Sequence, residues 1–205
     1  MELIGKRPKQ ATEVRQASLV AAALALAAQR SPAGITTSDL AQAVGITQGA
    51  MFRHFASKEA VWLAALDWAS DTLMARLHAA ADLPGPLAAL QAVFMAHVDF
   101  VVAHPGVPRV IFQELQHAED TPLKARVHNL MQQYRALLVG LLQRAHQQQQ
   151  LAANTDLQAA AVLFVGSVQG LVMQSLISGQ VSAMAAQAPG VFTLYLRGLT
   201  LKEAP

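Results

Sequence analysis

Residues 35–55, ITTSDLAQAVGITQGAMFRHF, decide the fold of this 205-residue chain. The hydroxyl of Thr36 and the acid three residues on, Asp39, match the capping box that opens a helix. Gly45 supplies the left-handed residue at which a short helix stops, and Thr47 is the N-cap of the next one. The stretch therefore predicts two short helices, 37–44 and 48–54, joined by a tight turn.

The apolar residues of this stretch are spaced to point inward and to pack on a preceding helix, which we predict over 13–29. They are Leu40, Ala41, Val44, Ile46, Met51 and Phe55. Such packing holds two short helices at the steep angle of a helix-turn-helix. The outward face of the second helix then shows Gln48, Gly49, Phe52 and Arg53, and a helix of this kind can enter the major groove of DNA by its N-terminal residues.

Polar residues beside this face suit the phosphates of DNA. The hydroxyls of Thr37 and Thr47 can donate to phosphate oxygens, and His54 and Lys58 would flank the same backbone. With Thr36, the predicted DNA-binding residues are Thr36, Thr37, Thr47, Gln48, Gly49, Phe52, Arg53, His54 and Lys58. From spacing alone, a plain helical corner whose threonines only cap helices remains open.

Charge supports an anionic partner for the N-terminal part. Residues 1–60 hold seven lysines and arginines against four acids, a net charge of +3, whereas the rest of the chain has a net charge of −1. Lys6, Arg7 and Lys9 form an arm that we expect either to add DNA contacts or to be a solvated tail. The absence of cysteine excludes disulfides and thiolate metal sites, so the sequence predicts a cytoplasmic protein.

This region resembles the N-terminal signature of the TetR (tetracycline-repressor type) transcriptional regulators over residues 12–62. The resemblance lies in Ile35–Thr37, Leu40-Ala41, Gly45–Gly49, Phe52–Phe55 and Ser57–Ala60. It implies DNA contacts from Thr37, Thr47, Gln48, Gly49, Phe52, His54 and Lys58, and a second domain that dimerises and binds a ligand. The family usually has tyrosine where this chain has Phe52, so a hydrogen bond from this position to a phosphate is not expected.

The rest of the chain shows helical periodicity, and we predict an all-α fold. The expected helices span 58–81, 87–103, 108–117, 121–150, 155–178 and 189–202. We predict an N-terminal arm and helix-turn-helix domain over 1–57 and a connecting helix with a dimerisation and ligand-binding bundle over 58–205. The apolar stretch Leu157–Ile177 is interrupted by polar residues, which favours a buried helix over a membrane span.

The helix predicted over 155–178 is apolar on nearly every face, so it must be buried, either in a homodimer or at the centre of a monomer. Gly166 and Gly170 would let another helix approach closely. Together with the last helix, which carries Leu194 and Tyr195, this helix is predicted to form a four-helix interface across a two-fold axis.

The apolar helix 87–103 carries His97 and Asp99, and polar groups in such a helix either find buried partners or line a cavity. The predicted ligand-binding residues are Phe94, His97, Asp99, Phe100, Phe112, Gln113, Met131, Phe164, Gln169 and Met173. Taken singly, the aromatic residues and methionines also fit an ordinary core. His97 and His104 lack a third ligand at suitable spacing, so neither a metal nor a cofactor is expected.

The function predicted from these residues is a ligand-responsive repressor that, as a homodimer, binds a palindromic double-stranded DNA operator and responds to a small-molecule effector. No membrane partner is expected. The sequence contains no nucleophile elbow, P-loop, dinucleotide-binding glycine motif or zinc-protease motif, so an enzyme is not predicted. The alternatives are a helical small-molecule-binding or interaction protein that uses the helix-turn-helix only as a scaffold, and an uncharacterised enzyme.

Overall fold

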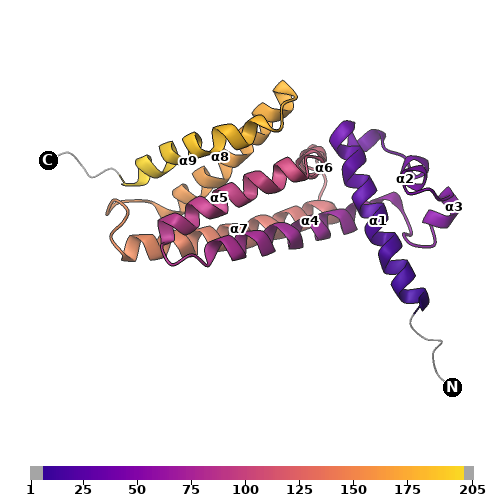
Figure 1. Ribbon diagram of the computed structural model, residues 1–205, viewed down its shortest axis with the longest axis horizontal. Helices are drawn as coiled ribbons and strands as arrows, with labels where there is room; N and C mark the ends of the chain where they lie inside the picture. The colour runs from indigo at the N-terminus through magenta and orange to yellow at the C-terminus, as the bar shows by residue number, and fades with distance from the viewer. Residues whose placement is uncertain (1–6, 201–205) are drawn as a thin grey trace, which may run out of the picture. The chain divides into compact units, whose positions relative to one another are not determined.

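The computed structural model describes the backbone of residues 7–200 and the side chains of residues 12–200, and every regular element in this range is a helix (Figure 1). The elements are α1 (Arg7–Gln29), the 3-10 turn η1 (Pro32–Gly34), α2 (Thr37–Ala43), α3 (Gln48–Met51), α4 (Lys58–Ala81), α5 (Pro86–Ala103), α6 (Gly106–Glu114), α7 (Pro122–Gln147), α8 (Leu157–Ser178) and α9 (Ala183–Thr200). The predicted all-α fold is confirmed. The side chains of the N-terminal arm lie outside the described residues.

The chain divides into two compact units. Within the described range, unit 1 comprises residues 7–69 and 104–127, and unit 2 comprises residues 70–103 and 128–200. Within unit 1, α1 contacts both α2 and α6; within unit 2, α5, α8 and α9 pack on one another. The Pro- and Gly-containing break at 82–86 is the kind of segment expected to link two functional units, but here it joins α4 to α5 inside unit 2. The functional boundary at residue 57 stays a prediction.

The capping signals of the helix-turn-helix are present as predicted. The Thr36 hydroxyl oxygen accepts a hydrogen bond from the Asp39 backbone N–H at 3.1 Å, and the Asp39 carboxylate accepts from the Thr36 N–H at 2.8 Å. This backbone hydrogen bond, together with those from the Thr36 hydroxyl and Arg30, lowers the pKa of Asp39 to about 2. Gly45 has a φ of +69°, and Thr47 accepts from the Ala50 N–H at 3.2 Å.

The core of unit 1 joins these short helices to α1. Four of the six predicted inward residues are buried, namely Leu40, Ala41, Met51 and Phe55, while Val44 and Ile46 are partly exposed. On α1 they are matched by a buried stripe of small and branched apolar residues: Leu19, Ala23, Leu24 and Ala27. The structure therefore confirms that α2 packs both on α1 and on α3.

Three helices have ends that differ from the prediction for local reasons. α3 stops at Met51 rather than at residue 54, because the N–H groups of Arg53 and His54 bond three residues back in tighter turns. α6 begins at Gly106 and ends at Glu114, since Pro108 lies in the first turn, where no N–H partner is needed. α7 ends at Gln147, because Gln149 has a φ of +56° and the Gln150 N–H bonds back to the Ala145 carbonyl.

α9 begins six residues before the predicted start at Pro189, which lies inside the helix. A proline there removes the hydrogen bond to the carbonyl of Ala185. Both residues are exposed, so water can bond to that carbonyl, and the helix continues. An exposed proline is therefore tolerated where the sequence suggested a helix start.

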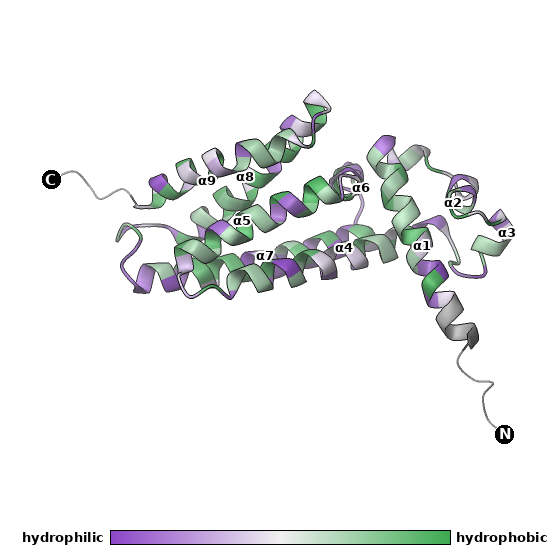
Figure 2. Cartoon of the chain, viewed as in Figure 1, coloured by the Kyte–Doolittle hydropathy of each residue, from purple (hydrophilic) through white to green (hydrophobic). Residues whose placement is uncertain are grey.

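Unit 2 is built on an aromatic core. The Phe94 ring of α5 lies 5.2 Å from that of Phe164 in α8 and 5.4 Å from that of Phe192 in α9, and Tyr195 packs 5.5 Å from Phe164. Figure 2 shows the apolar character of α5 and α8. By length and composition alone both helices could cross a membrane; 50% of the apolar window of α5 and 39% of that of α8 are buried within the fold. The core helix of a soluble protein has the same composition.

One close backbone contact ties α6 to α1 inside unit 1. A Cβ atom added at Gly106 would lie 2.0 Å from the Leu24 carbonyl oxygen and 3.1 Å from the Ala28 nitrogen. Only a residue without a side chain fits between the first turn of α6 and the backbone of α1.

We predict that Gly106→Ala lowers the free energy of unfolding of unit 1 by at least the 1–3 kcal/mol typical of overpacking, because two backbones must separate. The measurement is urea unfolding followed by tryptophan fluorescence, since Trp62 and Trp68 both belong to unit 1. Gly49→Ala is the control: the space beyond its Cβ position is open, and unfolding should be unchanged or harder. Equal stability of Gly106→Ala and wild type would contradict the close contact.

Candidate functional site

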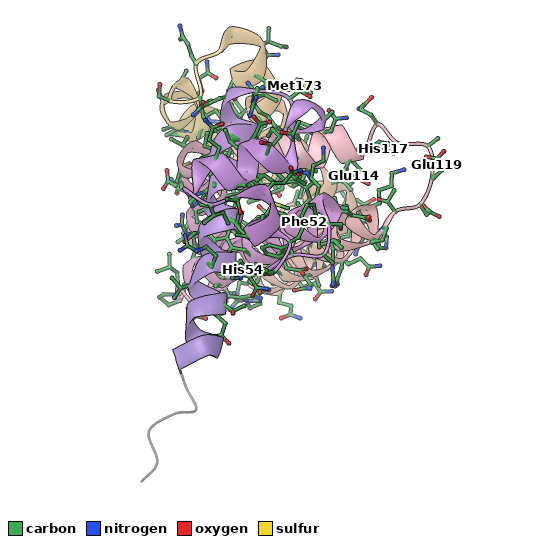
Figure 3. The ribbon with its side chains drawn as sticks, turned by 90° about the vertical axis from the view of Figure 1, so that its right-hand side faces the viewer. Phe52, His54, Glu114, His117, Glu119 and Met173 are labelled. Carbon is green, nitrogen blue, oxygen red and sulfur yellow. The ribbon has the colours of Figure 1, made fainter. Side chains whose placement is uncertain are left out.

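The surface formed by α3 and the turn after it is exposed. Gln48, Gly49, Phe52 and Arg53 all lie on the outside, as their spacing predicts. Phe52 is 45% exposed although it is a large apolar residue, and Figure 3 labels it near His54.

Two helices of this surface are joined by a side-chain hydrogen bond. The Gln48 side-chain amide donates to the Thr37 hydroxyl oxygen at 2.6 Å, so the first residue of α2 contacts the first residue of α3. The neighbouring Thr36 is engaged differently, because its backbone N–H and its hydroxyl both bond to Asp39. Thr36 therefore stabilises α2, and Thr37 belongs to the outer surface.

Lys58 and His54 form hydrogen bonds with the segments next to this surface. The Lys58 ammonium group donates to the Ile35 carbonyl oxygen at 2.9 Å and to that of Ala33 at 3.4 Å, which closes the loop before α2. The His54 carbonyl accepts from the Gln16 side chain of α1 at 2.8 Å. The ring nitrogen Nδ1 of His54 is buried, and no group among the described residues bonds to it. Both residues are half-buried, so they have structural roles besides any contact with a ligand.

In unit 2, a polar pair borders the aromatic core, with Tyr134 fully buried and His97 partly buried. The His97 Nδ1 atom of α5 is 3.1 Å from the Tyr134 hydroxyl of α7, and their rings make an edge-on contact. Burial disfavours the charged imidazolium and lowers the pKa of His97 to about 4; burial also raises the pKa of Tyr134 above its ordinary value. His97 is therefore neutral at pH 7. The sequence analysis did not identify Tyr134, because no pattern in a single sequence shows that Tyr134 pairs with His97.

The other residues predicted to bind a ligand do not form one site. Phe94, Phe100 and Phe164 are fully buried, with the Phe100 ring also facing the Arg76 guanidinium at 5.6 Å. Phe112 and Gln113 belong to unit 1, where Gln113 accepts from the Ser31 hydroxyl. Asp99 is exposed, since a residue two positions from His97 lies on another side of the helix, and Met173 is exposed as well. Asp99 and Met173 are therefore not part of the buried core of unit 2.

Met131 and Gln169 line a surface groove of about 330 Å³ between α7 and α8. Its other lining residues are His128, Gln132, Arg135, Ala161, Val162 and Val165. The sequence analysis did not predict the polar residues that α7 contributes to this groove. They lie on one face of α7 with Met131, at spacings of three and four residues. Among the described histidines, aspartates and glutamates, no group of three could hold a metal ion.

α8 and α9 carry an uncovered apolar face, which we call the α8/α9 face. It comprises Val162, Leu163, Met173, Ile177 and Leu194, of which Ile177 is 73% and Leu194 69% exposed. Gly166 and Gly170 are exposed on α8, with open space beyond their Cβ positions. Tyr195 is not part of this face, contrary to the sequence prediction. Its ring packs on Phe164, and its hydroxyl donates to the Ala160 carbonyl oxygen at 3.1 Å.

Comparison with known families agrees with this architecture. The family model described as bacterial regulatory proteins, tetR family, matches residues 19–65, and the tetracyclin repressor-like C-terminal domain matches residues 86–189. The chain belongs to the tetR family. Like other tetR-family regulators, it is a DNA-binding transcriptional regulator, which makes the exposed face of α3 the region to consider for DNA.

Among curated proteins, this tetR-family regulator is similar to the nucleoid occlusion factor SlmA of Glaesserella parasuis, with 28% identity over 69% of this chain and 71% of the relative. Among solved structures, it is similar to the Bacillus subtilis regulator FadR in complex with stearoyl-CoA (TM-score 0.76, 17% identity, covering 89% of this chain and 98% of FadR). It is also similar to the ketosteroid regulator KstR2 of Mycobacterium tuberculosis (TM-score 0.77, 24% identity, 92% and 96% coverage). At these identities the two structures show the fold alone.

We predict that His97 makes stability depend on pH. Its pKa is 6.5 in the unfolded chain and about 4 in the fold, so the stabilisation is complete above pH 6.5 and is lost as pH falls towards 4. The difference of about 2.5 units corresponds to about 3 kcal/mol. Urea unfolding followed by circular dichroism at pH 7 and pH 4.5 measures it, and His97→Leu should show a smaller loss. The same pH dependence in both chains would contradict the buried neutral imidazole.

Proposed function

We propose that the chain is a ligand-responsive repressor that binds a palindromic DNA operator as a homodimer and is released by a small-molecule effector. The observation that carries this proposal is the exposed face of α3, where Gln48, Gly49 and Phe52 lie beside Thr37 in a tetR-family helix-turn-helix. Enzymatic activity is not part of the proposed function, and the proposed location is the cytoplasm.

In the proposed complex, each side chain of this surface has a separate role. Gln48 reads a base edge in the major groove, and Gly49 lets the backbone approach closely. The hydroxyls of Thr37 and Thr47 and the cations Arg53 and Lys58 contact phosphates, with His54 beside them. The Phe52 ring packs against the sugar-phosphate backbone without a hydrogen bond, since it has no hydroxyl. Thr36 acts through its capping box, which fixes the start of α2.

The proposed effector site is the interior of unit 2 around His97 and Tyr134. The surrounding side chains, Phe94 and Phe164 among them, are apolar, so this pair can orient a mainly apolar effector by a hydrogen bond. A neutral imidazole can either donate or accept, which suits a carbonyl or hydroxyl group. The similarity to FadR, whose fold holds stearoyl-CoA, and to the ketosteroid regulator KstR2 supports an apolar effector.

The effector acts by binding one of two conformations more tightly. It can shift the population only by its differential affinity for the conformation that does not bind DNA. α4 is the proposed connection, because its residues 58–69 belong to unit 1 and its residues 70–81 to unit 2. The helix also begins at Lys58, which holds the loop before α2.

The proposed homodimer uses the α8/α9 face. Five large apolar side chains are exposed there, and no charged residue lies on α8. Burial of such a face removes apolar surface from water at about 25 cal/mol per Å². Gly166 and Gly170 let the partner helix come close, and Leu194 extends the face onto α9.

A second candidate function follows from the curated relative SlmA, a nucleoid occlusion factor. A factor that acts on the nucleoid would occupy sites away from promoters, whereas a repressor occupies the promoters of the genes that it controls. Mapping of the sites that the chain occupies on its own chromosome separates the two functions, and we propose the repressor.

We predict that binding to a palindromic duplex selected by the wild-type chain falls steeply with salt, because phosphate contacts release counterions. Gln48→Ala should relax the preference at one base position per half-site, with a loss of about 1–3 kcal/mol in discrimination. Lys58→Ala should weaken binding to selected and random duplexes alike. Fluorescence anisotropy measures both, with thermal unfolding as a check, since Lys58 also holds two carbonyls. Equal losses on both duplexes for both variants would contradict the assignment.

We predict that Gly170→Leu reduces dimerisation and operator binding together. The space beyond Gly170 is open within the single chain, so the added side chain leaves the subunit intact and forces the partner helix away. Sedimentation velocity measures the assembly. Gly140→Leu is the matched control, because Gly140 is also a helical glycine with open space but lies on α7. A Gly170→Leu chain as dimeric as wild type would remove α8 from the interface.

A further inference from the structure

The hydrogen bond between Thr37 and Gln48 joins the two short helices of the helix-turn-helix at their exposed ends. The Gln48 amide nitrogen lies 2.6 Å from the Thr37 hydroxyl oxygen, and the two residues are 11 positions apart in sequence. Packing does not require this bond, because Gln48 is exposed and the buried contacts between α2, α3 and α1 come from other residues. The bond therefore affects the arrangement of the side chains on the outer surface.

The bond restricts the side chain that is proposed to read a base. An exposed glutamine is free to adopt many rotamers, and ordering a side chain of this length costs conformational entropy. With one N–H group held by Thr37, the amide is ordered before DNA arrives. The groups that remain for a ligand are its carbonyl oxygen and its second N–H, one acceptor and one donor.

The Thr37 hydroxyl has spare capacity in this arrangement. A hydroxyl group has one donor hydrogen and two acceptor lone pairs, and the Gln48 amide uses one lone pair. No other hydrogen bond of the Thr37 side chain is present among the described residues, so its hydrogen is available for a phosphate oxygen. Thr36 has no such freedom, because its hydroxyl both donates to and accepts from Asp39.

We propose that Thr37 is a positioning residue for base recognition, which orients the Gln48 amide so that its free acceptor and donor match the N6 and N7 edge of adenine. The proposal rests on the proposed function, since it needs α3 in the major groove. Adenine presents N7 as acceptor and the N6 amino group as donor, the complement of the amide. Thr37 then contacts the phosphate and orders the base-reading side chain at the same time.

This role differs from that of an ordinary phosphate contact in what it does to specificity. A residue that contacts only phosphate changes the affinity for every duplex by the same factor, since phosphates carry no sequence information. A residue that orients Gln48 changes the preference at one base pair of each half-site and leaves the other positions unchanged. The base profile of a Thr37 variant therefore separates the two roles.

The experiment selects duplexes from a random library with the full-length wild-type chain and with three variants, Thr37→Val, Thr37→Ser and Gln48→Ala. Valine has nearly the shape of threonine but lacks the hydroxyl, and the capping box on Thr36 is untouched, so the fold should be retained. Gln48→Ala identifies which base position the glutamine reads. Sequencing of the selected duplexes gives the base preference at every position.

We expect the wild-type chain to select adenine at the position that Gln48→Ala relaxes. In Thr37→Val, the adenine preference there should fall at least fivefold, with the preferences at other positions retained, and Thr37→Ser should keep the wild-type profile. In the free protein, the Gln48 side-chain amide signals in nuclear magnetic resonance spectra should move in Thr37→Val and stay in Thr37→Ser.

Three outcomes would overturn the proposal. A Thr37→Val chain that binds all duplexes more weakly with an unchanged profile would make Thr37 a phosphate contact only. Selection of guanine at the Gln48 position would contradict the orientation of the amide. A wild-type chain that enriches no sequence would overturn the proposed function itself, and this inference with it.

Discussion

The burial of Leu40 and Met51 in the core of unit 1 is the constraint on which the proposed DNA-binding surface depends. Both side chains are fully buried, one from α2 and one from α3, and α2 contacts both α1 and α3, so the two short helices share one core. Neither helix is stable alone, because seven and four residues are far below the length at which isolated helices form in water. The exposed positions of Gln48, Phe52 and Arg53 follow from what is buried behind them.

Hydrogen bonds at the helix ends make this packing specific. The capping box of Thr36 and Asp39, the N-cap at Thr47 and the left-handed Gly45 each fix the start or the end of a short helix. Lys58 closes the loop before α2, although it is also the cation expected to contact DNA. The same side chains thus serve the fold and the surface, so affinity for DNA and stability of unit 1 are coupled at several of these positions.

Unit 2 differs in that its aromatic core includes a polar pair, while some of its large apolar side chains are exposed. His97 and Tyr134 are paired within an aromatic core, whereas Ile177 and Leu194 face outward from α8 and α9. An apolar core keeps the imidazole neutral and leaves it able to hydrogen-bond to an uncharged group. Large contiguous apolar patches on a protein surface mark sites that bind a partner. A ligand-binding interior and a dimer interface are the functions that these two features support.

The sequence by itself determined the features that depend on neighbours within a few residues. The capping box, the turn at Gly45, the outward face of α3 and the all-helical class all follow from local hydrogen bonds and from periodicity, and the structure agrees with each. Only the tertiary structure decided which distant residues meet. Tyr134 completes the environment of His97 from 37 positions away, Tyr195 turns into its own core, and Asp99 faces solvent. The way in which helices pack decides which group becomes the partner of a buried polar side chain. That packing depends on the sum of many weak contacts between segments that are remote in sequence. No local sequence pattern contains this information.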